Sequence, residues 1–426
     1  MVMSATAAGT DAPGEGSTGS DAAHSERAVR YPAANDAHEA ITIGVSMSLT
    51  GALGLNGRSA LLAQKIWVDD INSRGGLLGR PVQLVVYDDR TDGTLVPDIY
   101  RRLMDVDEVD LVLGGYGTNT LAPAMPLIAE RNRYFVGLMG LGVNTERQYP
   151  NYFAMIPTGP DPSSALTEGF FELAAQQVPR PRTVAFISAD AEFARNPIIG
   201  AAENAEKHGF TVIDEITYSL STSEFTPIID SVVGKDPDLL LLCCYLDDSI
   251  GLVKALRSSD WVPKMVGGAM TGPQSTAVKS ALGPLLNGVV NYEYWLPVPS
   301  MMFTGVEALM NTYQLRAQAE NADPIGSYMA PQAYAQMQVI EQAVAATGSL
   351  DDQALAQYTR TESFDTVVGA VKFGIGGEWE HPRVIQVQYQ NVTDAGQEQF
   401  KHSHTQVVVA PAGYTSGAFR YPYRAK

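Results

Sequence analysis

The chain has 426 residues, 45% of them hydrophobic, and its 29 basic and 47 acidic side chains leave a formal charge of −18. This length is sufficient for more than one hydrophobic core, so we expect two lobes or domains. The acidic balance argues against binding to nucleic acid or to an anionic membrane surface. No apolar run approaches the roughly 18 residues that a membrane-spanning helix needs.

The first 40 residues are rich in Ala, Gly, Ser, Thr and Asp and show no apolar periodicity. We therefore predict a disordered tail over residues 1–40. The first ten residues lack the basic start and the continuous apolar core of a secretory signal. A cytoplasmic protein and an exported protein whose signal lies upstream both stay open.

Predicted strands and helices alternate from residue 41 onward. In the first half, strands are expected over residues 41–47, 82–87, 111–113 and 134–139, with helices up to 72, over 95–106 and from about 121. The second half repeats this plan, with strands over 183–187, 210–216, 239–243 and 264–266 and helices over 195–208, 225–233 and 248–258. Helices near 300–321 and 328–347 and strands near 367–373, 384–390 and 406–409 complete the chain. This alternation predicts two doubly wound α/β lobes with a cleft between them.

The segment 111–126 combines a buried strand, a glycine-rich turn and a helix start. The glycines of Gly114–Gly117 allow close backbone approach, and Thr118–Thr120 offers hydroxyl and amide groups. Free backbone N–H groups at a helix start can bind a small anion such as a carboxylate. An ordinary strand-to-helix turn with threonine as the N-cap explains the same residues, and both interpretations stay open.

Asp247 and Asp248 follow the strand 239–243, where the second lobe repeats the glycine-rich turn of the first. A carboxylate at this strand end can face the cleft and bind a cationic group. Aspartate is also a good N-cap for the helix that follows, which is the simpler interpretation. One aspartate could cap while the other faces the cleft, and a ligand with both charges would then hold the lobes together.

Motifs of hydrolases and metal sites are incomplete. The sequence has no Gly-x-Ser-x-Gly elbow, and the adjacent Cys243 and Cys244 lack an obvious histidine partner. Neighbouring residues of a strand point to opposite faces, so we expect two buried thiols rather than a disulfide. His402 and His404 have a spacing that could bind a metal, but no third ligand is evident. We predict no metal site.

A dinucleotide site is the enzyme alternative, because Gly115 and Gly117 match two glycines of a Gly-x-Gly-x-x-Gly pattern. Thr120 replaces the third glycine, and no acidic residue ends a strand about 20 residues later to hold a ribose. The pattern also follows the third strand of the lobe rather than the first. We therefore predict a protein without a cofactor that is not an enzyme.

Several segments carry a family resemblance through their order and spacing: Ile43–Gly51, Asp70–Pro81, Tyr87–Asp89, Gly114–Thr118, Tyr218–Pro227, Asp236–Asp238 and Thr366–Phe373. Together they resemble the leucine/isoleucine/valine-binding protein family, the type I solute-binding proteins of ABC importers, from residue 41 to about 423. The resemblance implies a Venus-flytrap fold with three crossovers. Lobe 1 would comprise residues 41–155 with 292–382, and lobe 2 residues 156–291 with 383–426.

The resemblance also implies a ligand site in the cleft. The turn of Tyr116, Gly117 and Thr118 would hold the ligand carboxylate, with Thr118 at the position of the family's serine. Leu141 would contribute a backbone contact. Asp248 would pair with the ligand ammonium.

Four further positions in the implied site are Asn56, Val143, Phe193 and Tyr328. Three depart from the family pattern, since Val143 stands where a threonine is frequent, and Asn56 and Phe193 where tyrosine is frequent. Each lost polar contact changes which ligand groups can be satisfied. A branched-chain amino acid is therefore not the assured ligand.

The sequence as a whole predicts the solute-binding component of an ABC importer. It would bind an amino acid, an amide or an aromatic or aliphatic carboxylate by cleft closure, without chemistry. Its other partners would be permease subunits, and its place the periplasm or the cell exterior, with or without a lipid anchor. The alternative is a cytoplasmic amide or amino-acid sensor of the same fold.

Overall fold

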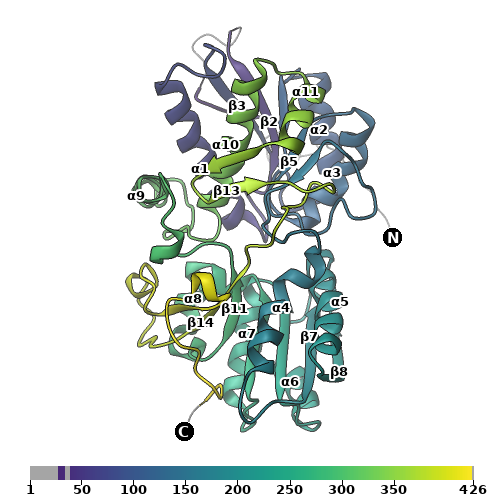
Figure 1. Ribbon diagram of the computed structural model, residues 1–426, viewed down its shortest axis with the longest axis vertical. Helices are drawn as coiled ribbons and strands as arrows, with labels where there is room; N and C mark the ends of the chain where they lie inside the picture. The colour runs from purple at the N-terminus through teal and green to yellow at the C-terminus, as the bar shows by residue number, and fades with distance from the viewer. Residues whose placement is uncertain (1–26, 34–38, 425–426) are drawn as a thin grey trace, which may run out of the picture.

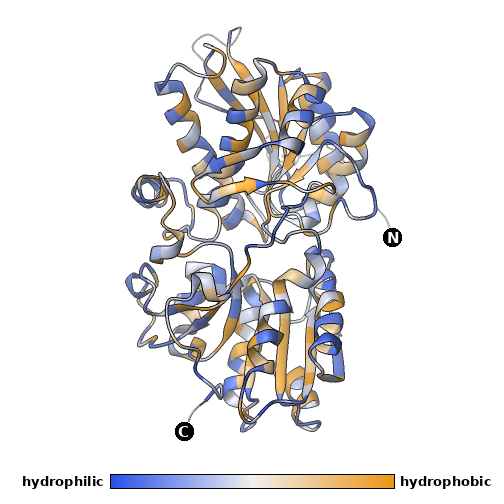
Figure 2. Ribbon diagram, viewed as in Figure 1, coloured by the Kyte–Doolittle hydropathy of each residue, from blue (hydrophilic) through white to orange (hydrophobic). Residues whose placement is uncertain are grey.

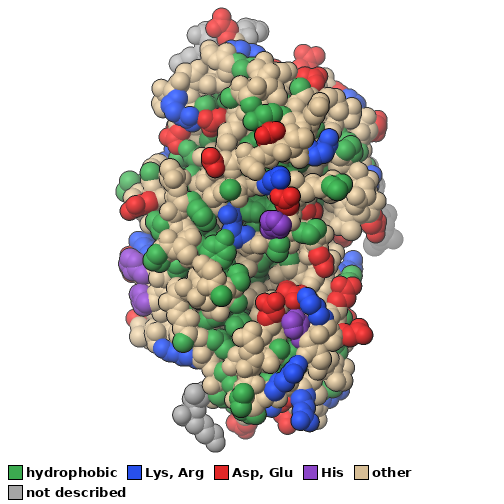
Figure 3. All heavy atoms as spheres, in the orientation of Figure 1, with side chains coloured by type: hydrophobic (Ala, Val, Ile, Leu, Met, Phe, Trp, Pro, Cys, Tyr) green, Lys and Arg blue, Asp and Glu red, His purple; other side chains and the backbone are tan. Residues whose placement is uncertain are grey.

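The computed structural model describes residues 27–33 and 39–424, which form two α/β lobes, one above the other in Figure 1. Each lobe has a central sheet packed against helices. Figure 2 shows that hydrophobic residues concentrate on the strands, while the helices carry hydrophilic residues on their outer faces. Acidic and basic side chains lie over both lobes on the face drawn in Figure 3.

The upper lobe is built on a four-stranded sheet of order β1-β3-β2-β4. Its strands are β1 (Val29–Tyr31), β2 (Ile41–Met47), β3 (Val82–Asp88) and β4 (Leu111–Leu113), and β2 pairs in parallel with both β3 and β4. The parallel pair β5 (Phe135–Gly137) and β6 (Tyr152–Ala154) continues this sheet through a bridge between Tyr116 and Leu138. The helices are α1 (Gly54–Ser73), α2 (Val96–Asp105), α3 (Thr118–Glu130), α10 (Ala330–Thr347) and α11 (Asp352–Thr361).

The lower lobe is built on a seven-stranded sheet of order β15-β14-β11-β10-β9-β7-β8. The strands β7 (Thr183–Ala189), β8 (Thr211–Tyr218), β9 (Leu239–Cys244), β10 (Met265–Met270) and β11 (Val290–Glu293) run parallel, and β14 (Ile385–Tyr389) and β15 (Gln406–Ala410) add antiparallel. The helices are α4 (Pro162–Ala175), α5 (Glu192–Lys207), α6 (Thr226–Val233), α7 (Leu246–Ser258) and α8 (Thr276–Leu282). Every residue of β9 is buried, as a continuous apolar run in the middle of a parallel sheet should be.

Three connections join the lobes, between β6 and α4, between β11 and α9 (Val306–Arg316), and between β13 (Gly369–Lys372) and β14. Arg383 contacts all three. Its backbone N–H donates to the carbonyl of Pro157 in the first connection, at 2.8 Å. Its guanidinium lies over the ring of Phe303 in the second, at 5.2 Å, and over that of Trp379 in the third, at 4.6 Å. One residue, Arg383, thus connects the three segments of the hinge.

Asp323, between α9 and α10, provides a further link between the lobes. Its carboxylate accepts hydrogen bonds from the backbone N–H (2.7 Å) and hydroxyl (2.5 Å) of Thr276, at the start of α8 in the lower lobe. Its own backbone N–H donates to the hydroxyl oxygen of Ser59 on α1, in the upper lobe, at 2.9 Å. Asp323 is only 6% exposed, so this link is shielded from water.

The predicted α/β fold with two doubly wound lobes is confirmed, and several local predictions need correction. Helices α4, α8 and α11 were not predicted. The strand expected near 367–373 is β13, which begins two residues later because residues 367–368 form the turn of its hairpin with β12 (Ser363–Thr366). The helix expected over 300–321 is the shorter α9. The proposed lobe boundaries stay a prediction.

The predicted disordered tail over residues 1–40 is wrong where the structure describes it, and residues 1–26 and 34–38 lie outside the described part. Strand β1 pairs antiparallel with β3. The hydroxyl of Tyr31 donates to Asp69 at 2.8 Å, and Arg30 forms an ion pair with Asp107 at 2.8 Å. A three-residue strand has too little periodicity to be predicted, and these long-range contacts hold it in place. None of the described helices is long and apolar enough to cross a membrane.

Candidate functional site

A cavity lies between the lobes, where the carboxyl ends of strands from both sheets face each other. It contains about 370 Å³ of atom-free space, of which only a small part is wide enough for a water molecule. The side chains and backbone that line it are Leu53, Tyr116, Gly117, Thr118, Asn119, Met139, Ile156, Phe193, Tyr245, Thr271, Tyr294 and Tyr328. None of these lining residues, taken from the described part of the chain, is charged at neutral pH.

The amino-terminal turn of α3 forms one wall of this cavity. Gly117 is the N-cap, with a φ of +97° that suits glycine, and its N–H donates to the carbonyl of Leu138 at 3.1 Å. The next two N–H groups, of Thr118 and Asn119, have no acceptor among the described residues. Such unsatisfied donors at the positive end of a helix form a receptor for an anion.

The Thr118 hydroxyl adds a third donor to this wall. Its oxygen accepts a hydrogen bond from the N–H of Leu141 at 3.0 Å, which fixes the side chain. Thr118 is only 3% exposed, and its hydroxyl hydrogen finds no acceptor in the described part of the chain. The hydroxyl can therefore donate to a bound anion while remaining anchored by Leu141. Thr118 does not cap the helix, contrary to the simpler interpretation of the sequence.

Aromatic rings from both lobes form most of the remaining wall. Tyr116 and Tyr328 meet edge to face at 6.2 Å between ring centroids, and Tyr294 stacks on Tyr328 at 5.9 Å. From the lower lobe, Phe193 and Tyr245 meet edge to face at 6.0 Å. Burial raises the pKa of Tyr245 to about 12, so this hydroxyl stays protonated. The aromatic rings thus present flat, uncharged surfaces to a ligand in the cavity.

Asn119 bridges the two lobes at the edge of the cavity. Its side-chain Nδ2 donates to the hydroxyl of Tyr245 at 3.2 Å, and its Oδ1 accepts from the N–H of Phe193 at 3.3 Å. A third contact between the lobes runs from Nδ2 of Asn196 to the carbonyl of Leu141, at 3.4 Å. The two bonds of Asn119 connect the first turn of α3 with the starts of α5 and α7 in the lower lobe.

The Asn119→Ala variant is expected to weaken ligand binding by about tenfold, because it removes two bonds worth roughly 1 kcal/mol each that hold the lobes together. Calorimetric titration with a panel of carboxylates would measure the loss, which should be similar for every ligand that binds. Asn311→Ala, on the exposed face of α9, is the matched control and should bind normally. Unchanged affinity in Asn119→Ala would show that these bonds do not support the bound conformation.

Asp248 does not line the cavity, contrary to the role that the resemblance implies. Helix α7 already begins at Leu246, with Tyr245 as its N-cap, so both aspartates lie in the first turn and neither is the N-cap. The Oδ2 of Asp248 instead accepts a hydrogen bond from the hydroxyl of Tyr218 at 2.9 Å. Burial raises the pKa of Asp248 above its ordinary value, which makes a permanent negative charge here less favourable.

The other predicted residues divide into two groups. Tyr116, Gly117, Thr118, Phe193 and Tyr328 line the cavity, and their contacts with a ligand stay a prediction. The second group comprises Asn56, Leu141, Val143 and Asp248, which are not among the lining residues.

Two of that second group act through lining residues. Asn56 is buried and donates to the Tyr116 hydroxyl at 2.9 Å. Leu141 uses its N–H on Thr118, so this amide is already engaged. Val143 instead borders a separate surface pocket with Glu146. It follows a turn at Gly142, with φ of +66°, that the sequence did not reveal.

Seven lining residues were absent from the predicted site: Leu53, Asn119, Met139, Ile156, Tyr245, Thr271 and Tyr294. Tyr245 could have been found, because it ends the second lobe's strand in the same way that Tyr116 follows β4. The predicted equivalence of the two lobes therefore pointed to a tyrosine rather than to Asp248. Tyr294 and Thr271 follow β11 and β10, and only the sheet order shows that these strand ends face the cavity.

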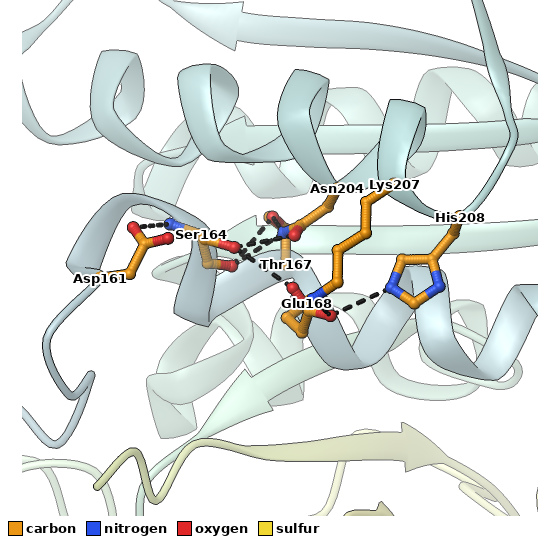
Figure 4. A network of polar contacts seen from close by, with 7 residues as sticks. All are labelled: Asp161, Ser164, Thr167, Glu168, Asn204, Lys207 and His208. Carbon is orange, nitrogen blue, oxygen red and sulfur yellow. Dashed lines mark hydrogen bonds and ion pairs between the residues drawn. The ribbon is translucent and has the colours of Figure 1, made fainter.

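One described group of side chains has the composition of a metal site, and none of its members lines the cavity. Figure 4 shows two of them, Glu168 and His208, in their network of polar contacts. Ligand atoms of Glu168, Glu172 and His208 lie within 4.8 Å of one another. Glu168 already forms an ion pair with Lys207 at 2.7 Å, and Nε2 of His208 lies within hydrogen-bond distance of the same carboxylate, at 3.0 Å. This network joins α4 to the end of α5. The Lys207 ammonium already supplies a positive charge next to the Glu168 carboxylate.

A family model described as "Periplasmic binding protein" matches residues 40–396. Among curated proteins, the chain is similar to Leu/Ile/Val-binding protein homolog 8 of Brucella abortus (strain 2308). The two are 20% identical over 363 residues, which cover 82% of this chain and 88% of the relative.

Solved structures of the same fold include a substrate-binding protein of a branched-chain amino acid transporter from Streptococcus pneumoniae, in complex with isoleucine. It superposes with a TM-score of 0.71 at 16% identity, over 83% of this chain and 97% of its own. A solute-binding protein of an ABC transporter from R. palustris, in complex with benzoate, superposes with a TM-score of 0.70 at 14% identity. That match covers 89% of this chain and 98% of the other.

Proposed function

Because the chain belongs to the periplasmic binding protein family, we propose that it is the solute-binding component of an ABC importer and holds a small carboxylate between its lobes. The observation that carries this proposal is the first turn of α3. Two backbone N–H groups and the Thr118 hydroxyl have free donor capacity there, beside a cavity that both lobes enclose. Ligand binding would stabilise the closed arrangement, in which bonds such as those of Asn119 form.

The importer role is favoured over a cytoplasmic sensor of the same fold. The similar structures are described as substrate-binding or solute-binding proteins of transporters, and the curated relative as a Leu/Ile/Val-binding protein. The partners would be permease subunits that recognise the closed form, and the protein would act in the periplasm or at the cell exterior. No bond-making chemistry is needed, because binding and release suffice.

The Thr118→Val variant tests the carboxylate site. Valine keeps the shape of threonine but removes the hydroxyl, so binding of any carboxylate ligand should weaken by about tenfold or more. Calorimetric titration of the variant against the original protein would measure this, after a thermal-shift screen of carboxylates has identified a ligand.

Thr118→Ser retains the hydroxyl and should recover most of the affinity. Thr312→Val, on the exposed face of α9, is the control for a lost threonine hydroxyl away from the cavity. Equal affinity of Thr118→Val and the original protein would place the carboxylate elsewhere. Loss of thermal stability with unchanged binding would indicate a purely structural threonine.

A further inference from the structure

The walls of the cavity also restrict which chemical group the ligand can carry besides its carboxylate. Five of the twelve lining residues are aromatic, and they come from both lobes and from the connection after β11. Tyr116, Tyr328 and Tyr294 form a continuous group of rings on one side. Phe193 and Tyr245 form a second pair on the lower-lobe side. Apolar side chains such as Leu53, Met139 and Ile156 fill the spaces between them. These surfaces suit a flat ring better than a branched aliphatic chain.

The same walls offer no counter-charge for an ammonium group. No acidic side chain is among the described lining residues. Asp248, the carboxylate expected from the sequence, is bound by the Tyr218 hydroxyl at 2.9 Å. The side-chain oxygen of Asn119 already accepts from the N–H of Phe193. A buried ammonium without a paired carboxylate is strongly unfavourable, whereas a carboxylate would find the donors of α3.

The hydroxyl groups of the aromatic wall define what the far part of a ligand could carry. Tyr294 lines the cavity and is only 1% exposed, so its hydroxyl lies in the buried wall. The hydroxyl of Tyr245 accepts from Asn119 and so can still donate. Both groups are neutral, since burial raises the pKa of each. They could satisfy a hydroxyl on a ligand ring but could not neutralise an amine.

We propose that the ligand is an aromatic carboxylate without an amino group, held by its carboxylate at α3 and by its ring between the tyrosines and Phe193. This inference rests on the proposed function and narrows its ligand class. It predicts that selectivity against amino acids comes from the missing counter-charge. Selectivity against aliphatic acids comes from the rings.

Matched ligand pairs test the two parts separately by calorimetric titration. 3-Phenylpropanoate and L-phenylalanine differ only in the amino group, and 4-methylpentanoate and L-leucine form the aliphatic pair. We expect 3-phenylpropanoate to bind at least about tenfold more tightly than both L-phenylalanine and 4-methylpentanoate. Equal or tighter binding of either amino acid, or of 4-methylpentanoate, would overturn the ligand class while leaving the carboxylate site intact. Failure of all four, and of benzoate and 4-hydroxybenzoate, would instead overturn the proposed function.

A ring variant checks the geometry. Phe193→Leu keeps an apolar side chain but removes a ring, so it should weaken 3-phenylpropanoate severalfold and 4-methylpentanoate less. Phe193→Tyr retains the ring and is the matched variant, for which 3-phenylpropanoate should keep most of its affinity. Circular dichroism of each variant would verify the fold. Equal losses of affinity for both acids in Phe193→Leu would show that the Phe193 ring does not contact the ring of the ligand.

Discussion

Gly115→Ala is expected to destabilise the protein by about 3 kcal/mol or more and to distort the carboxylate site. A Cβ atom at Gly115 would lie 1.9 Å from the backbone carbonyl oxygen of Ser46, on the neighbouring strand β2. Backbone atoms cannot rotate away as a flexible side chain does, so β2 and the turn after β4 would have to separate. That turn leads directly into Gly117 and Thr118, so its displacement would also move the donors of α3.

Urea unfolding of Gly115→Ala and of the original protein would give the difference in free energy of unfolding. Gly413→Ala is the control, because Gly413 is exposed, has no atom within 4 Å of its added Cβ, and should be nearly neutral. A Gly115→Ala variant as stable as Gly413→Ala would mean that β2 and β4 are not as closely spaced as described.

Asp323→Ala should cost about 3 kcal/mol or more, because a buried carboxylate with several donors cannot be removed without leaving them unsatisfied. The carboxylate accepts from the N–H and hydroxyl of Thr276 and from the N–H groups of Ile325 and Gly326, each of these two at 3.0 Å. Asp323 also offsets the charge of the buried Lys279, whose pKa burial lowers. Removing it should loosen α8 from the upper lobe as well as destabilise the chain.

Thermal and urea unfolding would measure this loss, and Asp323→Asn should lie between Asp323→Ala and the original protein, because its amide oxygen can still accept. The control is Asp260→Ala, an exposed aspartate before β10 whose replacement should change little. If Asp323→Ala were as stable as Asp260→Ala, the link between α8 and the upper lobe would contribute nothing to folding.

The sequence predicted the fold well because its periodic signals are strong. Continuous apolar runs such as Leu239–Cys244 are typical of strands in the middle of a parallel sheet, and the regular alternation with helices favours a parallel arrangement. Prediction failed where tertiary contacts decide the structure. Strand β1 is held by contacts of Tyr31 and Arg30 with distant residues, and short helices such as α8 have too few turns to show a period.

Sequence reasoning named more cavity-lining residues in the upper lobe than in the lower lobe, where Phe193 was the only one, and their contacts with a ligand stay a prediction. Gly117 and Thr118 lie in a motif whose glycines and hydroxyls indicate an anion-binding turn from local sequence alone. The sequence could not show which way Asp248 points. A shift of one residue in the start of α7 decides whether a first-turn side chain faces the cavity or a neighbouring tyrosine, here Tyr218. No local pattern shows that start. Aromatic residues such as Tyr294 are equally common in a hydrophobic core. Only the three-dimensional arrangement therefore shows whether such a residue lines a cavity or packs inside the lobe.

The order of strands in the lower sheet also determines when that lobe can be completed. Strand β14 lies next to β11, although about 90 residues of the upper lobe and the connections separate them in the chain (residues 293 and 385). As a ribosome synthesises the protein from its amino terminus, the outer edge of β11 therefore lacks its partner until almost the last residues emerge. An unpaired strand edge exposes backbone N–H and C=O groups that can pair with a strand of another chain and so promote aggregation. Nascent chains that stop before residue 385 should consequently be the form most dependent on chaperones.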